Sequence, residues 1–485
     1  MVSFLIALGV LVAGYFVYGL FAERVFGIDG SRPTPAMTKA DGVDFMPLPT
    51  WKVFMIQFLN IAGLGPIFGA IMGIMFGPAA FLWIVFGTIF GGAVHDFLSA
   101  MISLRTGGKS LPEIVGDELG MTVRQVMRVF SIFLLVLVGA VFVVTPSNLI
   151  ASMTPDSLDA TFWAIAIFIY YILATMLPVD KLIGNLYPLF GGALLFMAVA
   201  LLYVLLFGDV TIPDGFSQGL FNRHPAAESQ PIFPMMFVSI ACGAISGFHA
   251  TQSPMMARCL KNEKLARPVF YGAMVAEGVV ALIWAAAAIA FTGGYAELAA
   301  YMAADGHSAG ALVHDISIGW LGTVGGVLAI IGVVAAPITT GDTALRSARL
   351  IVADMTGFSQ QRIWKRALLC LPIFGVTFAL MLIDFNVLWR YFAWSNQTLS
   401  VFTLWAVTVY LARRGKFYMI SLVPALFMTV VCTSYLLMAP VPEGFGLDLT
   451  VAMSVGMSVS VVFLCLFALF LRNLRAGRVQ TSYDY

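Results

Sequence analysis

Charged residues are scarce in this chain: they make up 11% of its 485 residues, whereas hydrophobic residues make up 60%. A composition so poor in charge excludes an ordinary soluble domain and is typical of a protein that crosses a membrane many times. The net charge of +1 gives no reason to expect a nucleic-acid partner. The lipid bilayer is therefore the first partner that the sequence predicts.

Motifs for metal and ATP chemistry are also missing. The chain has no His-Glu-x-x-His string and no Gly-x-x-x-x-Gly-Lys-Ser/Thr string, so we predict neither an enzyme nor an ATP-driven pump. Its five cysteines form no Cys-x-x-Cys pair, which gives no case for a disulfide or a thiolate metal site. We predict no cofactor and no metal, although His95, Asp96 and His249 could still meet across helices to hold an ion.

The apolar residues fall into thirteen segments, each long enough for a transmembrane helix. They cover 3–23, 53–76, 80–104, 125–148, 160–178, 186–207, 232–254, 268–292, 318–340, 366–384, 387–412, 417–438 and 449–472. This division places 24 of the 26 Lys and Arg residues on one side, and only Arg223 and Arg390 on the other. By the positive-inside rule the basic side is cytoplasmic, so the N-terminus is outside and the C-terminus is cytoplasmic. Because the first segment has its basic residues after it, we expect a retained helix rather than a signal peptide.

Two of these segments are interrupted in the same way. The first break reads Asn60-Ile61-Ala62-Gly63-Leu64-Gly65-Pro66, and the second covers 243–254 and ends in Ser253-Pro254. Each segment starts apolar, passes through glycine and polar residues, and restarts at a proline, which suits the first position of a helix. Paired interruptions in two halves of a membrane chain predict a transporter binding site at the broken helices.

The positions of the breaks predict an inverted repeat. The first break lies in span two, which runs outward, and the second lies in span seven, which runs inward. We therefore predict an all-α polytopic membrane protein with a five-plus-five inverted-repeat core, one helix before it and two after it. The predicted units are 1–51 (first helix and loop), 52–207 (repeat 1), 232–412 (repeat 2), 417–472 (two C-terminal helices) and 473–485 (cytoplasmic tail).

Several strings are similar to the carbon starvation A (CstA) family of bacterial and archaeal transporters. They are Pro33-Thr34-Pro35-Ala36, Asp41-Gly42-Val43-Asp44-Phe45-Met46-Pro47, Ile61-Ala62-Gly63-Leu64-Gly65-Pro66-Ile67, Gly92-Ala93-Val94-His95-Asp96-Phe97, Gly243-Ala244-Ile245-Ser246-Gly247-Phe248-His249 and Ala336-Pro337-Ile338-Thr339-Thr340-Gly341-Asp342-Thr343-Ala344-Leu345-Arg346. The resemblance implies a member of the amino acid–polyamine–cation superfamily, with a leucine-transporter-type core, in a prokaryotic inner membrane. It also implies uptake of peptides, or of pyruvate driven by protons.

The two breaks supply the candidate substrate-binding residues. They are Asn60, Gly63, Gly65, Pro66, His249, Thr251, Gln252 and Ser253. The N–H groups after Pro66 form a helix end that suits a substrate carboxylate, and Ser253 could cap a helix that begins at Pro254. His249 could donate to the substrate or relay a proton. The alternative is that the glycines serve helix packing and that a backbone carbonyl satisfies His249.

Ionisable and hydroxyl residues in the spans are the candidates for coupling to a proton or another cation, because such groups are costly in a membrane. They are His95, Asp96, Glu277, Thr339, Thr340 and Asp342. The resemblance implies a sodium site made by the Thr339 and Thr340 hydroxyls with carbonyls of the first break. Asp342 could instead pair with Arg346, four residues on, at the cytoplasmic margin.

The positions of these residues along the spans limit how they can meet. All of them, together with the two breaks, fall at a similar depth, which permits one cluster without requiring it. His95 and Asp96 are helix neighbours that point about 100° apart, so we do not expect them to face one partner together. Arg390 lies in an aromatic run near the outer surface, where it could form an outer gate or simply snorkel from an interfacial belt.

These features predict a secondary active importer of a small carboxylate nutrient, pyruvate or a short peptide, by symport with a cation. A proton is the favoured driver, and alternating access takes place around the two broken helices. One alternative is a sodium-coupled amino acid or peptide symporter. A weaker alternative is a membrane protein with an intramembrane metal site.

Overall fold

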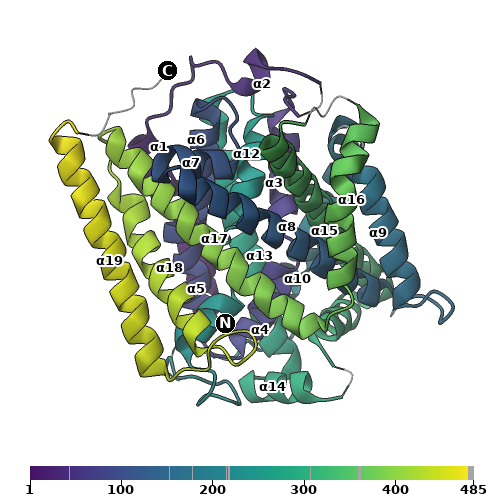
Figure 1. The fold of residues 1–485 in the computed structure, drawn as a ribbon. Coiled ribbons are helices and arrows are strands. Elements are labelled where there is room, and N and C mark those ends of the chain that lie inside the picture. The colour runs from purple at the N-terminus through teal and green to yellow at the C-terminus, as the bar shows by residue number, and fades with distance from the viewer. Residues whose placement is uncertain are drawn as a thin grey trace.

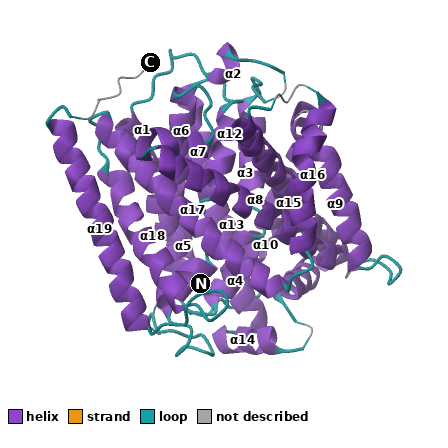
Figure 2. Cartoon of the chain, viewed as in Figure 1, coloured by secondary structure: helices purple, strands orange, loops and turns teal. Residues whose placement is uncertain are grey.

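The computed structural model describes residues 1–42, 44–151, 153–176, 179–214, 216, 219–305, 307–358 and 362–478. Within them all regular structure is helical, and the longer helices stand side by side in one bundle (Figures 1 and 2). The first half contains α1 (Val2–Phe26), α2 (Pro35–Thr38), α3 (Thr50–Ile61), η1 (Gly65–Gly69), α4 (Ala70–Ile74), α5 (Ala79–Phe86), η2 (Gly87–Gly92), α6 (Ala93–Arg105), α7 (Leu111–Leu119), α8 (Met121–Ala151), α9 (Ala160–Met176) and α10 (Val179–Phe207). The second half contains η3 (Ile232–Met236), α11 (Phe237–Ser239), α12 (His249–Ala257), η4 (Glu263–Leu265), η5 (Arg267–Tyr271), α13 (Gly272–Thr292), α14 (Tyr295–Ala303), α15 (Ala309–Thr356), α16 (Ile363–Leu380), α17 (Phe385–Arg413), α18 (Met419–Met438) and α19 (Leu449–Arg475). The prediction of an all-α polytopic membrane protein is confirmed.

In the described residues, ten of the thirteen predicted segments correspond to helices that are long and apolar enough to cross a membrane. Nine are single helical stretches, and the tenth is α3 with η1 and α4, bent by 53° at a short break. The remaining three, 160–178, 232–254 and 387–412, are helical but are not among those ten. They form α9, the pair α11 and α12 with the gap between them, and α17; residues 177–178 lie outside the described residues.

Loops predicted to share a side of the membrane lie together. The N-terminal amine of Met1 donates to the carbonyl of Ile212, and both were assigned to the outer side. Arg105 bonds Glu263 between two loops assigned to the inner side. The N-terminus and the C-terminal end of α19 lie at opposite faces of the bundle, as an odd number of crossings requires (Figure 1). The structure thus agrees with the predicted alternation, while the face that meets the cytoplasm stays a prediction, and the tail beyond 478 lies outside the described residues.

Both predicted breaks are present, and the first lies within the predicted limits, 60–66, with a helical restart at Pro66 as predicted. Helix α3 ends at Ile61, residues 62–64 are irregular, and Pro66 stands at the start of η1. In the second segment α11 ends at Ser239 and α12 begins at His249, so the irregular stretch is 240–248. Helix α3 packs against α12 and α4 packs against α11, so the two broken segments run in opposite directions, as an inverted repeat requires. The limits of the two repeats stay predictions.

The prediction that the second helix restarts at Pro254 with Ser253 as its cap is wrong. Pro254 lies inside α12, and the side-chain oxygen of Asn396, in α17, accepts the N–H of Phe248 at 2.7 Å. Because that oxygen satisfies a free N–H at the helix start, the helix can begin five residues earlier. Ser253 instead accepts a hydrogen bond from Gln57 of α3, at 3.0 Å.

The helix that contains span nine is longer than the predicted span, 318–340. Helix α15 runs from Ala309 to Thr356 and is kinked at Gly322, whose φ of 67° suits glycine. Arg346 and Arg349 are buried in this helix. Arg346 donates to the carbonyl of Ala174, close to the end of α9, at 2.7 Å. The position of both arginines at the cytoplasmic margin stays a prediction.

The two breaks touch each other at their glycines. A Cβ added to Gly65 would lie 2.0 Å from the Cβ of Cys242, and one added to Gly243 would lie 3.5 Å from the Cα of Pro66. Gly243 also has a φ of 89°, which side chains other than glycine rarely adopt. The irregular stretches of the two broken helices are therefore packed directly on one another in the core.

Candidate functional site

Four of the predicted site residues form one buried group, which we call the histidine cluster: His95, Asp96, His249 and Glu277. Asp96 lies at its centre, with Oδ1 2.8 Å from Nδ1 of His95 and Oδ2 3.0 Å from Nδ1 of His249. On the other side of His249, Nε2 lies 3.6 Å from Oε2 of Glu277. None of the four side chains is exposed. A chain of imidazoles and carboxylates thus runs through the core.

Three helices position this cluster. His95 and Asp96 come from the start of α6, His249 is the first residue of α12, and Glu277 comes from α13. The second break is also held directly, because the N–H of Gly243 donates to Oε1 of Glu277 at 3.0 Å. His95 and Asp96 are helix neighbours, which we expect to point apart. The His95 ring nevertheless turns back, and its Nδ1 contacts Oδ1 of Asp96. A carboxylate that accepts two imidazole N–H groups fixes both rings.

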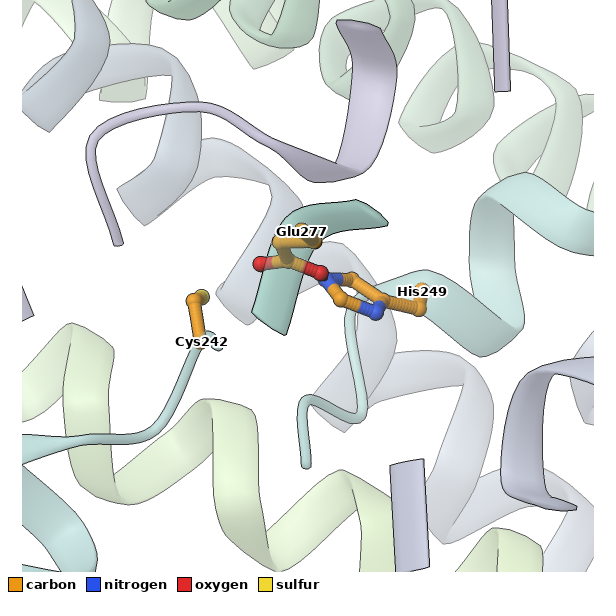
Figure 3. Close-up of side chains that lie close together, drawn as sticks. All are labelled: Cys242, His249 and Glu277. Carbon is orange, nitrogen blue, oxygen red and sulfur yellow. The ribbon is translucent and has the colours of Figure 1, made fainter. Parts of the chain in front are cut away.

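Two residues beside the cluster were not predicted as site residues: Cys242 and Asn396. Cys242 lies near the start of the irregular stretch 240–248, and its Sγ accepts a hydrogen bond from Nδ2 of Asn396 at 3.3 Å. Figure 3 shows Cys242, His249 and Glu277 grouped around one point, with the carboxylate next to the imidazole. The sequence signals were present, because Cys242 directly precedes Gly243 and Asn396 lies in the polar end of the aromatic run.

A second buried group, which we call the threonine cluster, consists of Asn60, Thr339, Thr340 and Thr343. The Thr340 hydroxyl lies 3.3 Å from the carbonyl of Leu59 and 3.1 Å from that of Asn60, at the end of α3. The Thr343 hydroxyl lies 3.4 Å from Oδ1 of Asn60. Thr339 turns back to its own helix, where its hydroxyl bonds the carbonyls of Ala335 and Ala336. The Thr340 hydroxyl also bonds its own helix, at 2.8 Å from the carbonyl of Ala336, but of the two threonines it is the one that also contacts the first break.

Asp342 lies beside the threonine cluster. Its Oδ2 accepts a hydrogen bond from the Tyr187 hydroxyl at 2.9 Å, and the same hydroxyl lies 3.1 Å from the carbonyl of Thr339. Tyr187 belongs to α10 and was not predicted from the sequence. The predicted coupling residues thus fall into two groups, one around Asp96 and one around Thr340.

The remaining predicted substrate residues lie on α12 and at the first break. The amide nitrogen of Gln252 bonds the hydroxyls of Thr251 and Ser347, at 3.0 and 3.5 Å. At the first break, the N–H groups of Ile67 and Phe68 both donate to the carbonyl of Leu64. The helix end after Pro66 is therefore occupied by its own chain in this conformation, and a substrate carboxylate would have to displace that carbonyl.

A cavity of about 620 Å³ lies on the predicted outer side. Its lining includes Phe68, Met72, Asn148, His307, His314, Asp315 and Trp389. Aromatic rings lie between it and the first break: Trp389 packs on Phe392, and Phe392 packs on Phe142. On the predicted inner side, a pocket of about 20 Å³ borders Thr251 and Ser347, and one of about 390 Å³ borders Glu118 and Phe467.

Arg390 lies in the outer wall, as predicted, and its guanidinium pairs with Glu443 rather than extending alone into a lipid interface. Both residues line a second outer cavity of about 390 Å³. Its proposed part in a gate stays a prediction. The pairing shows that α17 is tied to the loop between α18 and α19 on this side.

One string in the outer loop, Gly215-Phe216-Ser217-Gln218-Gly219, matches Gly-x-Ser-x-Gly, the pattern around many serine nucleophiles. Residues 215, 217 and 218 lie outside the described residues. A nucleophile elbow needs a strand before the serine and a helix after it, and the described part of the chain contains no strand. The string therefore gives no support for an enzyme.

Comparison with known proteins connects this arrangement to transport. The model of the family described as carbon starvation protein CstA matches residues 1–162 and 153–324. An uncharacterized membrane protein of Haemophilus influenzae is 42% identical over 338 residues, which cover 60% of this chain and 91% of that protein. The peptide transporter CstA of Campylobacter jejuni is 30% identical over 57% of this chain and 48% of its own length. The pyruvate/proton symporter BtsT of Escherichia coli is 26% identical over 57% of this chain and 47% of its own length.

Two solved structures share the fold at low sequence identity. A Na⁺-coupled sialic acid symporter matches with a TM-score of 0.54 and 14% identity, over 96% of each chain. A manganese transporter of Eremococcus coleocola matches with a TM-score of 0.50 and 11% identity, over 90% of this chain and 99% of its own. At these identities the likeness concerns the helical arrangement alone.

Proposed function

The chain belongs to the carbon starvation protein CstA family, and we propose that it is a secondary active transporter that imports a small carboxylate nutrient together with a proton. A transporter role is supported by relatives that are named as transporters. The proposed substrates, pyruvate or a short peptide, are those of these relatives. This chain spans about half the length of the two transporters, so their activities come to it only as proposals.

The observation that carries the proposal is the contact between the two breaks. Gly65 lies against Cys242, and four buried ionisable side chains lie directly beside that contact. Irregular backbone at membrane depth is tolerated where it lines a site, and broken helices allow the two halves of a segment to tilt separately. Both properties serve alternating access.

We assign the substrate carboxylate to the helix end after Pro66 and the coupling proton to the histidine cluster. Backbone N–H groups at a helix start attract an anion, and Ile67 and Phe68 become available when Leu64 moves away. His249 and Gln252 would then contact the remainder of the solute. The histidine cluster offers imidazole and carboxylate groups at one buried place, which is the chemistry that proton coupling needs.

A sodium-coupled symporter is the second candidate, and the threonine cluster favours it. The Thr340 hydroxyl and the carbonyls of Leu59 and Asn60 converge at the end of α3. Hydroxyl and carbonyl oxygens are ligands that suit a hard cation. This group requires no change in protonation, so the two candidates use different residues and can be separated by experiment.

The test is uptake of labelled pyruvate into proteoliposomes under an imposed proton gradient, repeated under a sodium gradient, with unlabelled dipeptides as competitors. We expect proton-driven uptake that Glu277→Gln abolishes and that Glu297→Gln, in the exposed part of α14, leaves unchanged. Uptake that requires sodium would replace the proton proposal with the second candidate. If labelled pyruvate is not taken up under either gradient, labelled dipeptides are tested directly, and no uptake of either solute would contradict the proposed substrate class.

A further inference from the structure

We propose that Cys242, His249 and Glu277 form a binding site for a transition-metal ion such as Zn²⁺. Sγ, an imidazole nitrogen and a carboxylate oxygen of these residues all lie within 4.8 Å of one another (Figure 3). Thiolate, imidazole and carboxylate are the three side-chain ligands that zinc uses. Tetrahedral zinc holds such atoms roughly 3.3–3.7 Å apart, so only a small contraction is needed. The inference does not depend on which solute the protein transports.

The first argument concerns the imidazole of His249. Its Nδ1 faces the Asp96 carboxylate at 3.0 Å, and a carboxylate accepts hydrogen bonds, so Nδ1 carries the proton. In the neutral ring Nε2 then presents a lone pair, which points at Oε2 of Glu277 at 3.6 Å. Both atoms are buried without a hydrogen-bond partner. Two buried acceptors that face each other require a positive charge between them, which is either a proton on Nε2 that pairs with Glu277 or a metal ion. The experiment below separates the two.

The second argument concerns the Cys242 sulfur. Oδ1 of Asn396 accepts the Phe248 N–H at 2.7 Å and the Ser246 hydroxyl at 3.0 Å, and these two contacts fix which way the amide points. Nδ2 must then face Sγ of Cys242, at 3.3 Å. Sγ also lies 3.6 Å from the Ser246 hydroxyl. Hydrogen bonds from neighbouring groups orient metal ligands, so the Asn396 amide fixes the sulfur beside the other two ligand atoms.

The third argument concerns the groups around the ligands. His249 is oriented by Asp96, which His95 contacts in turn, and this is the carboxylate–histidine arrangement that supports metal ligands. Glu277 is oriented by the N–H of Gly243 through its other oxygen. A divalent ion balances the thiolate and the Glu277 carboxylate, and the Asp96 carboxylate keeps its two imidazole partners, so the ion lowers the cost of burying these acids together. An ion here would join both ends of the second break to α13.

The experiment measures metal on full-length protein purified in detergent with its affinity tag removed. The protein is equilibrated with a buffered Zn²⁺ concentration, separated from free ion, and its zinc is counted by mass spectrometry. We expect close to one zinc per chain in the wild type. Bound zinc should fall at least about tenfold, at the same free zinc concentration, in each of the variants Cys242→Ser, His249→Gln and Glu277→Gln. Loss of a supporting residue lowers metal affinity by about this factor, and loss of a ligand should lower it at least as much. Asp96→Asn should weaken binding by about ten- to a hundredfold.

Matched controls change the same residue types elsewhere: Cys465→Ser, His307→Gln and Glu297→Gln, all at exposed positions. These variants should retain wild-type zinc. A loss in His307→Gln as large as that in His249→Gln would place the ion at the outer cavity and overturn the proposal. The proposal would also be overturned if the wild-type protein bound no more zinc than the Glu277→Gln variant.

A second measurement distinguishes the loss of one ligand from a variant that has misfolded. Co²⁺ loaded in place of Zn²⁺ gives visible absorption, with a sulfur-to-metal band when a thiolate is a ligand. We expect that band in the wild type and in Cys465→Ser, and its loss in Cys242→Ser with the remaining cobalt spectrum still present. Retention of the sulfur band in Cys242→Ser would show that another cysteine binds the metal. Uptake assays do not enter this test, so the transport proposal and the metal proposal can fail separately.

Discussion

The histidine cluster and the threonine cluster lie at the same pair of broken helices, yet they offer different chemistry. The histidine cluster places four ionisable side chains beside the second break, linked by contacts of 2.8 to 3.6 Å. The threonine cluster places neutral hydroxyls against backbone carbonyls of the first break, at 3.1 to 3.3 Å. Carboxylate and imidazole groups exchange protons or bind transition metals, whereas neutral oxygens suit a hard cation. One fold therefore contains two candidate cation sites, and their side chains suit different ions.

The same contrast appears in how the glycines of the first break are packed. Gly65 faces Cys242, next to the histidine cluster, and Gly63 faces Phe142 and Thr340. Gly65 is thus packed beside the histidine cluster and Gly63 beside the threonine cluster. The four predictions below are ways to separate the two clusters, taken from the largest expected effect to the smallest.

Removal of the Asp96 carboxylate should have the largest effect. Asp96→Ala leaves the buried imidazoles of His95 and His249 without their acceptor, and breaking such a buried pair costs about 3–5 kcal/mol. We expect a clear drop in thermal stability in detergent and the loss of uptake under either gradient. Asp156→Ala, at an exposed position, is the control and should behave as the wild type. Normal proton-driven uptake by Asp96→Ala would remove the histidine cluster from the mechanism.

An added methyl group at the first break should come next. Gly65→Ala would place its Cβ 2.0 Å from the Cβ of Cys242, whereas Gly63→Ala would meet its nearest atom, in Phe142, at 3.0 Å. Overpacking of this kind costs about 1–3 kcal/mol, so Gly65→Ala should be the more damaging of the two. Thermal unfolding and uptake measure the difference. Gly375→Ala, which has open space around it, is the control, and equal loss in all three variants would contradict the close approach of the breaks.

Loss of one hydroxyl should separate the two driving ions. Thr340→Val keeps the shape of the side chain but removes the oxygen that faces Leu59 and Asn60, a change worth about 1 kcal/mol. If sodium binds there, its apparent affinity should fall roughly fivefold, because 1.4 kcal/mol corresponds to a factor of ten. Proton-driven uptake should change little. Thr356→Val, at the exposed end of α15, is the matched control.

The outer ion pair should matter least. Arg390→Gln breaks the contact with Glu443, but the Arg390 side chain is 44% exposed, and such pairs contribute about 0–1 kcal/mol. We expect uptake within about threefold of the wild type, with a reduced dependence on ionic strength. A complete loss of uptake at every salt concentration would instead make Arg390 part of the substrate path.

Much of the fold followed from composition and charge. Because apolar segments must be helical in a bilayer and basic residues collect on one side, the sequence was enough to place the spans and both breaks. The start of α12 was misplaced, because it depends on a contact from another helix, that of the Asn396 side chain with the N–H of Phe248.

The candidate site was predictable in part for the same reason. The sequence alone determined which polar residues lie within the apolar segments, where each of them is costly and therefore stands out. It could not decide which of them meet, because that depends on how each helix is rotated and where it crosses its neighbours. Only the tertiary structure brought His249 between Asp96 and Glu277, separated Thr340 from that group, and placed Cys242 and Asn396 beside it.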